Sequence, residues 1–120
     1  MLKLSKHASI PQCVRMANQV YVEGFTFSAT GELRNGKPVP AHYRVHCVGE
    51  STQDAAGKPL PKPTFQGRWL EKIDPVEIPG HNPAADPEAT KALIETHLWS
   101  TRWQKSAKDS VGNAGIEVVK

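Results

Sequence analysis

His42, His46 and Cys47 are the residues whose types and spacing could most readily do chemistry. Two histidines four residues apart can bind one zinc ion from a helix, and a cysteine beside a histidine can act as a nucleophile. The segment 41–48, however, alternates apolar and polar residues as a strand does. In a strand, residues four apart lie about 13 Å apart along the axis, and successive side chains point to opposite faces. We therefore predict no metal site and no catalytic residue here, with Cys47 buried and both histidines facing water.

Carboxylates gather at Glu71, Asp74 and Glu77, with His81 beyond them. Acid–base catalysis needs paired groups whose pKa values are pushed apart by burial. Proline recurs at every fourth residue from Pro75 to Pro87, which keeps the chain extended or turning along a surface. We expect a solvated acidic loop rather than a catalytic pair.

Catalytic sequence motifs are lacking throughout the chain. It has no phosphate-binding loop, dinucleotide fingerprint, nucleophile elbow or Cys-x-x-Cys pair. The sequence therefore does not favour an enzyme and predicts no cofactor. An enzyme that works in a cleft between the acidic loop and the face formed by His42, Arg44 and His46 remains a third alternative.

Basic residues stand beside tryptophans at Arg68-Trp69 and again at Arg102-Trp103. Cations that hold phosphates and aromatic rings that stack on bases are the combination that binds single-stranded nucleic acid. The competing interpretation is that tryptophans at helical spacing belong to a core. The nucleic-acid alternative would use residues of the third strand and the C-terminal helix, namely Arg68, Trp69, Arg102, Lys105 and Lys108.

A long helix is predicted to begin at Pro87, because Asp86 supplies an N-cap acceptor and proline suits the first helical position. It extends to about residue 108. At about 100° per residue, Ile94 and Leu98 fall on the side opposite the core-facing stripe, among charged residues. An apolar pair in that position needs cover from a partner or from the chain's own N-terminal segment. The predicted stripe comprises Ala89, Ala92, Leu93, Trp99, Trp103 and Ala107.

The other predicted elements are strands, turns and one short helix. Asn35-Gly36 predicts a hairpin turn, and apolar spacing predicts an N-terminal helix near residues 11–18. Strands are expected over residues 20–28, 41–48, 64–72 and 115–119. We predict an α+β fold in which a mainly antiparallel sheet of three to four strands is covered on one face by the long C-terminal helix.

Length and composition are those of an ordinary globular domain. The 120 residues carry a net charge of +3 and contain two cysteines, Cys13 and Cys47. Two distant cysteines do not indicate a disulfide framework. No apolar run approaches the ~20 residues that span a bilayer, and the first residues do not form a secretory signal. We predict a single soluble domain over residues 1–120, located in the cytoplasm and without a membrane partner.

The function that we predict is that of a non-catalytic binding or accessory module. It would act through protein–protein contacts, either as a homo-oligomer or as a subunit of a larger complex. The stiff segment Pro59–Pro63 lowers the entropy cost of such binding. The expected contact residues lie on the helix, the terminal strand and this stiff segment: Ile94, Leu98, Ile116, Val118 and Leu60. Nucleic-acid binding remains the alternative.

Overall fold

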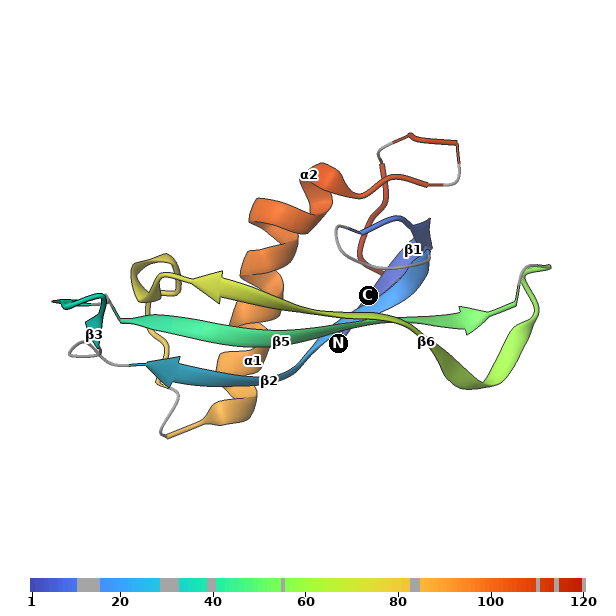
Figure 1. Ribbon diagram of the computed structural model, residues 1–120. Helices are drawn as coiled ribbons and strands as arrows, with labels where there is room; N and C mark the ends of the chain where they lie inside the picture. The colour runs from blue at the N-terminus through green and yellow to red at the C-terminus, as the bar shows by residue number, and fades with distance from the viewer. Residues whose placement is uncertain are drawn as a thin grey trace.

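The fold is a four-stranded antiparallel sheet with one helix lying across one of its faces (Figure 1). The computed structural model describes residues 1–10, 16–28, 33–38, 41–54, 56–82, 85–109, 111–113 and 115–119. The strands of this sheet are, in spatial order, β1 (Leu2–Ala8), β2 (Ala17–Ser28), β5 (His42–Gln53) and β6 (Pro59–Ile73). The predicted α+β fold with a mainly antiparallel sheet and a C-terminal helix is confirmed.

Strand β5 lies in the middle of the sheet and sets its two faces. Cys47 of β5 lies opposite Val22 of β2 and Trp69 of β6. Side chains alternate along a strand, so Tyr43, Val45 and Cys47 share one face, and all three are fully buried. The inward half of the alternation that the sequence predicts for this strand is therefore confirmed.

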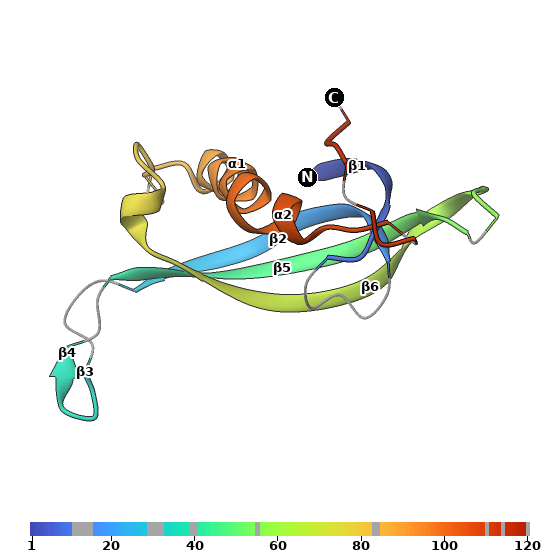
Figure 2. The same cartoon turned by 90° about the horizontal axis from the view of Figure 1, so that it is seen from above.

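A two-stranded hairpin interrupts the connection between β2 and β5. It consists of β3 (Leu33–Arg34) and β4 (Lys37–Pro38), and it projects beyond the end of the sheet (Figure 2). Asn35 and Gly36 between them have φ values of 53° and 75°. Positive φ at both central positions is what a type I′ turn requires, and asparagine and glycine tolerate it best. The predicted Asn-Gly hairpin is confirmed.

The helical segment begins where the sequence predicts. Asp86 caps α1 (Pro87–Leu98), with its Oδ1 accepting the Ala89 N–H at 3.0 Å. The segment continues through a π-helical turn, η2 (Trp99–Trp103), into α2 (Gln104–Ser106). A 3-10 turn, η1 (Pro75–Glu77), follows β6. Figure 2 shows α1 and α2 on the same side of the sheet.

The face of α1 that meets the sheet differs from the predicted one. Ile94 and Leu98 are 0% exposed, whereas Leu93 is 45% exposed. The cause is the π-helical turn, in which the Gln104 N–H donates to the Trp99 carbonyl five residues back. One extra residue in this turn brings two apolar rows, offset by one position, to the same side of the helix. The predicted position of Ile94 and Leu98 opposite the core-facing stripe is therefore wrong, and both are core residues. Trp99, Trp103 and Ala107 of the predicted stripe are buried as expected.

The hydrophobic core lies between the helical segment and the sheet. Its largest fully buried side chains include Trp103, Tyr43 and Ile73. The hydroxyl of Tyr43 is hydrogen-bonded to Nδ1 of His81, which ties the loop after η1 to the sheet. Burial raises the pKa of Tyr43 above its usual value, so this hydroxyl stays neutral.

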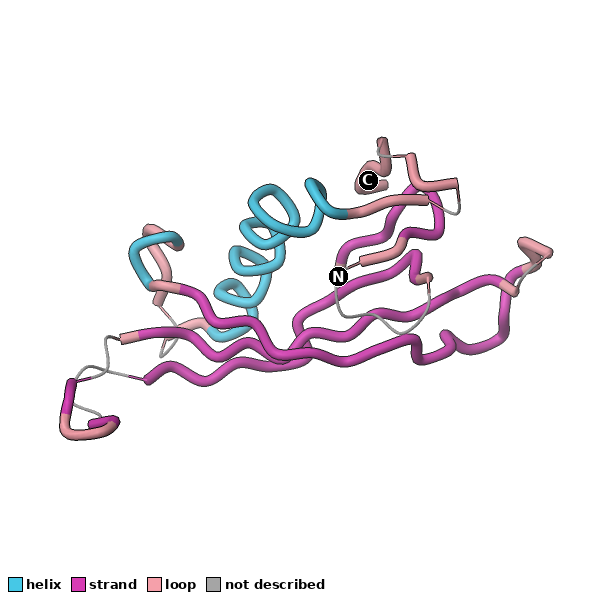
Figure 3. Tube along the Cα trace, turned by 45° about the horizontal axis from the view of Figure 1, so that its top comes forward, coloured by secondary structure: helices cyan, strands magenta, loops and turns pink. Residues whose placement is uncertain are grey.

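The two ends of the described chain lie together at β1 (Figure 3). The Ser5 N–H donates to the Glu117 carbonyl at 2.8 Å, and the Val119 N–H donates to the Lys3 carbonyl at 2.7 Å. The predicted terminal strand is thus reduced to an isolated bridge between Leu4 and Val118.

The predicted N-terminal helix near residues 11–18 is not shown. Residues 11–15 lie outside the described residues, and Ala17 and Asn18 already belong to β2. Across the described parts of the chain, no helix has both the length and the apolar character needed to cross a membrane.

Candidate binding surface

We call the sheet face opposite α1 the open face, because none of the described elements covers it (Figure 2). Arg44 and His46 are exposed on it, as the alternation of β5 predicts. Strand register places the residues of this face in three rows across β2, β5 and β6. The rows are Thr26, Arg44 and Lys72; Gly24, His46 and Leu70; and Tyr21, Val48 and Arg68.

Two cations stand directly opposite each other on the open face. Arg44 of β5 and Lys72 of β6 are paired across the strands, and both are exposed. Within the described ranges, neither makes an ion pair with a carboxylate. Like charges opposite each other on a sheet are destabilising. Among the described residues no ion-paired carboxylate offsets this repulsion, so an anionic group bound beside the pair would relieve it.

Arg68, by contrast, is already paired. Its Nε and Nη2 donate to the two carboxylate oxygens of Glu23 at 3.0 and 3.1 Å. Its guanidinium also lies 5.5 Å from the centre of the Phe65 ring, a cation–π distance. Phe65 itself is 55% exposed and Leu70 is 44% exposed. Apolar and charged side chains therefore alternate along the β6 side of the open face.

Hydrogen bonds among polar side chains occupy the far end of the open face. Glu50 accepts hydrogen bonds from Gln19 Nε2 at 2.8 Å and from the Tyr21 hydroxyl at 3.3 Å. Burial, followed by the negative charge of Glu50, raises the pKa of Tyr21, so the hydroxyl remains a donor. The donors around Glu50 make this end a structural network rather than an anion site.

Strand β6 forms one edge of the sheet. The Lys72 carbonyl accepts a hydrogen bond from Arg102 Nη2 at 3.1 Å, so it points away from β5. Backbone groups alternate in direction along an antiparallel strand, so the N–H and C=O of Arg68 and Leu70 point outward as well. We call the outer side of residues 64–72 the open edge.

A bulge in β2 supports the same alternation. The register shifts between Val22 and Gly24, and the Val22 N–H donates to Oε1 of the buried Glu95 at 2.8 Å instead of to β5. The opposite residue, Cys47, then directs its own backbone groups to β6 at Trp69. The backbone N–H and C=O of Trp69 therefore point toward β5, and those of its two neighbours on β6 point away from β5.

The two edges of the sheet differ in how their outward backbone groups are covered. Residues 117 and 119 donate to and accept from β1, so that edge is closed by the protein itself. On β6, Pro59, Pro61 and Pro63 lack the N–H that a ladder needs and protect only the first half of the strand. The second half, the open edge, contains no proline, although the Lys72 carbonyl at its end is bonded to Arg102 Nη2.

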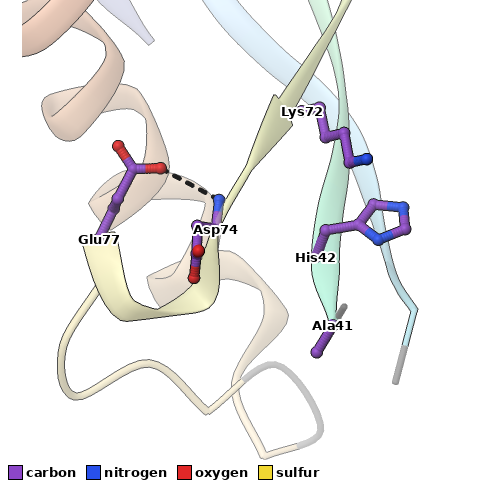
Figure 4. Close-up of a pocket in the computed structure, with 5 residues that line it drawn as sticks. All are labelled: Ala41, His42, Lys72, Asp74 and Glu77. Atoms are coloured by element: carbon purple, nitrogen blue, oxygen red, sulfur yellow. Dashed lines mark hydrogen bonds between the residues drawn. The ribbon is translucent and has the colours of Figure 1, made fainter. Parts of the chain in front are cut away.

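A pocket of about 310 Å³ lies where the open face meets η1 (Figure 4). Its lining combines cationic and anionic side chains: Ala41, His42, Lys72, Asp74 and Glu77. The carboxylates are already used as a capping box, because Asp74 accepts from the Val76 N–H and Glu77 accepts from the Asp74 N–H. His42 is 8% exposed, so its predicted position facing water is wrong. The pocket lies between the predicted acidic loop and β5, but its lining residues include no activated nucleophile.

Glu71 is not a solvated carboxylate of an acidic loop, as the sequence predicts, but a half-buried acceptor on the helix side of β6. Its Oε1 accepts from Trp69 Nε1 at 3.2 Å and from Trp103 Nε1 at 3.4 Å. Its Oε2 accepts from Arg102 Nη1 at 2.7 Å. We call these four residues the Glu71 clasp, because they fasten the helical segment to β6.

The structure does not gather the residues predicted for nucleic-acid binding. Arg68 lies on the open face, Trp69 and Arg102 belong to the Glu71 clasp on the other face, and Lys105 and Lys108 are exposed at the end of the helical segment. Trp69 is 6% exposed, so no base can stack on it in this conformation.

The residues predicted for partner contact are also mostly inside. Ile116 is buried, as are Ile94 and Leu98, and Val118 packs partly buried against the core. Leu60 alone of this set lies on β6, in its proline-rich half. Sequence reasoning missed the pairing of Arg44 with Lys72, because that pairing depends on strand register.

In the part of the chain that the structure describes, no group of three or more His, Cys, Asp or Glu side chains is placed to hold a metal ion. Cys13 lies outside that part. No protein family, curated protein or solved structure matches the chain at a significant level.

Proposed function

We propose that the protein is a non-catalytic protein-binding module that takes up an extended segment of a partner by strand addition at the open edge. The observation that carries this proposal is the difference between the two edges of the sheet. The chain closes the β1 edge with its own C-terminal residues, whereas no strand among the described residues pairs with the outer side of residues 64–72 of β6, where the Arg102 side chain occupies the Lys72 carbonyl. Exposed edges are sites of pairing with another chain, and proteins usually protect them.

Strand addition combines two sources of binding energy. Main-chain hydrogen bonds supply affinity, and contacts with alternate side chains supply specificity. The outward N–H and C=O groups of Arg68 and Leu70, with the N–H of Lys72, are the donors and acceptors for such a ladder, because the Lys72 carbonyl already accepts from Arg102 Nη2. Phe65 and Leu70, which are 55% and 44% exposed, offer apolar surface beside it.

Leu70→Pro is expected to abolish peptide binding at the open edge. The substitution removes an outward N–H and leaves the ladder with β5 intact, which an edge strand tolerates. Heptapeptides selected from a random phage-displayed library against the full-length chain should lose about tenfold or more in affinity for this variant, because a main-chain hydrogen bond is lost and the ring obstructs its neighbours. Fluorescence anisotropy of the selected peptides measures the change.

Leu70→Ala is the matched control for this experiment, because it keeps the N–H and removes only the side chain. It should retain most of the affinity that Leu70→Pro loses. Far-UV circular dichroism and thermal melting establish that both variants are folded. Selected peptides that bind Leu70→Pro as tightly as the wild type would contradict strand addition at this edge.

A second candidate function is binding of single-stranded nucleic acid on the open face. The specific observation in its favour is the pair of cations Arg44 and Lys72, which face each other and form no ion pair with a carboxylate of the described residues. Phe65 is exposed farther along β6, beside Arg68, and could stack on a base of the same strand.

The double variant Arg44→Gln/Lys72→Gln tests this second candidate. If both cations contact phosphates, the slope of log affinity against log salt for a labelled oligothymidine should become shallower by about 1.4. The control is Lys105→Gln/Lys108→Gln, whose charges lie at the end of the helical segment and should leave the slope unchanged. Equal slopes for wild type and both double variants would argue against this function.

A further inference from the structure

We infer that the segment bound at the open edge is acidic, with two carboxylates at alternate positions around one apolar residue. This inference rests on the proposed strand addition and names the chemistry of the partner. Side chains of an added strand that point to the open face would lie beside Arg68, Leu70 and Lys72, which share that face at successive alternate positions. The partner pattern that complements them is acidic-x-apolar-x-acidic.

The cation with the strongest demand for an anion is Lys72. It is exposed, it makes no ion pair among the described residues, and the guanidinium-bearing Arg44 is its direct cross-strand neighbour. A carboxylate opposite Lys72 on an added strand would lie one strand spacing from Lys72 and two from Arg44, so both cations would attract it, Lys72 the more strongly. This position contributes most of the expected charge preference.

Leu70 and Arg68 set the other two positions of the pattern. Leu70 lies between the cations and is 44% exposed, so an apolar partner side chain would remove it from water. Arg68 already donates from its Nε and Nη2 to Glu23. Fewer of its N–H groups are left for a partner, and its net attraction for a second carboxylate is weaker. The carboxylate opposite Arg68 is therefore expected to matter less than the one opposite Lys72.

Charge also argues against a second copy of this chain as the occupant. Antiparallel self-pairing that brings the two Leu70 side chains together sets Arg68 of each copy against Lys72 of the other. Like charges directly opposite are destabilising, and the repulsion occurs twice in such a dimer. An acidic segment from a different protein has no such penalty.

Three synthetic peptides test the inference on the full-length chain. The first has the pattern Thr-Glu-Thr-Val-Thr-Glu-Thr, the second replaces both glutamates by lysine, and the third rearranges the first so that the glutamates are adjacent. The first should bind at least about tenfold more tightly than either of the others, because only it places opposite charges in register. Binding by the first and third peptides alike would overturn the alternating pattern.

Charge reversal at one residue makes the test specific. Lys72→Glu should weaken binding of the alternating acidic peptide by about tenfold and bring the lysine peptide above its wild-type affinity. Arg68→Gln should have a smaller effect. Lys62→Glu is the matched control, because it makes the same change of charge on the proline-rich half of β6. It should leave the affinities for both peptides unchanged. Unchanged acidic-peptide affinity in Lys72→Glu would overturn the inference.

The outcomes separate this inference from the proposal on which it rests. Library peptides that lose affinity for Leu70→Pro but show no acidic preference would overturn the acidic partner and keep strand addition. A complete absence of peptides that depend on Leu70 would overturn both. A salt-resistant dimer in light scattering that Leu70→Pro converts to a monomer would overturn the acidic partner in favour of a second copy. Oligothymidine binding that Lys72→Glu removes, with no peptide binding, would overturn it in favour of nucleic acid.

Discussion

Ile94→Asp is expected to unfold the protein or to lower its free energy of unfolding by about 4 kcal/mol or more. Ile94 is 0% exposed and belongs to the core cluster between α1 and the sheet. An aspartate there would be an unpaired charge in an apolar site, and it would also remove a buried isobutyl-sized group. Single domains are typically stable by only about 5–15 kcal/mol, so most of the folding free energy would be lost. Urea unfolding followed by far-UV circular dichroism measures it.

Leu93→Asp is the matched control, one residue away on the same helix. Leu93 is 45% exposed, so an aspartate there should change the free energy of unfolding by no more than about 0.5 kcal/mol. The pair therefore reads out which way the helix faces. A folded Ile94→Asp together with an unfolded Leu93→Asp would mean that the helix is turned as uniform helical periodicity predicts.

Glu71→Ala is expected to destabilise the protein by about 3 kcal/mol. Glu71 accepts hydrogen bonds from two indole N–H groups and one guanidinium, and the bonds from Trp103 and Arg102 join β6 to the helical segment. Removing the acceptor leaves these donors in a half-buried site, which costs about 1–3 kcal/mol for a neutral donor and more for a charged one. Chemical unfolding monitored by tryptophan fluorescence is the appropriate measurement, because Trp69 and Trp103 report on the clasp itself.

Two further variants define this result. Glu71→Gln keeps one carbonyl acceptor but loses the charge opposite Arg102, so its destabilisation should be about half that of Glu71→Ala. Glu88→Ala removes a carboxylate that is 83% exposed and forms a surface ion pair with Lys91, and it should have little effect. A Glu71→Ala variant no less stable than Glu88→Ala would show that the clasp contributes nothing to the fold.

Local sequence rules predicted the elements that depend on neighbouring residues. Asn35-Gly36 gives a hairpin because both residues accept positive φ, and Asp86 before Pro87 gives a capped helix start. The prediction of which helix face meets the sheet failed, because a uniform rotation per residue cannot represent a π-helical turn. Ile94 and Leu98, followed by Trp99, Trp103 and Ala107, form two rows offset by one residue, and that offset is the signal that a sequence reader could have used.

The candidate site was less accessible from the sequence, because its parts come from distant strands. Arg44 and Lys72 become neighbours only through the register of β5 with β6. The open edge depends on strand order and on the C-terminal residues closing the β1 edge instead. Glu71 could have been placed better, since it lies two residues from Trp69 in the same strand and must share its face.

Amide hydrogen exchange of the isolated protein, measured by nuclear magnetic resonance, tests the open edge most directly. We expect the amides of Arg68, Leu70 and Lys72 to exchange quickly, and those of Trp69 and Glu71, which face β5, to be protected. Addition of the alternating acidic peptide should then slow exchange at residues 68, 70 and 72. Slow exchange at all five amides in the isolated monomer would contradict an open edge, because it would mean that the outer side of β6 already has a partner within the chain.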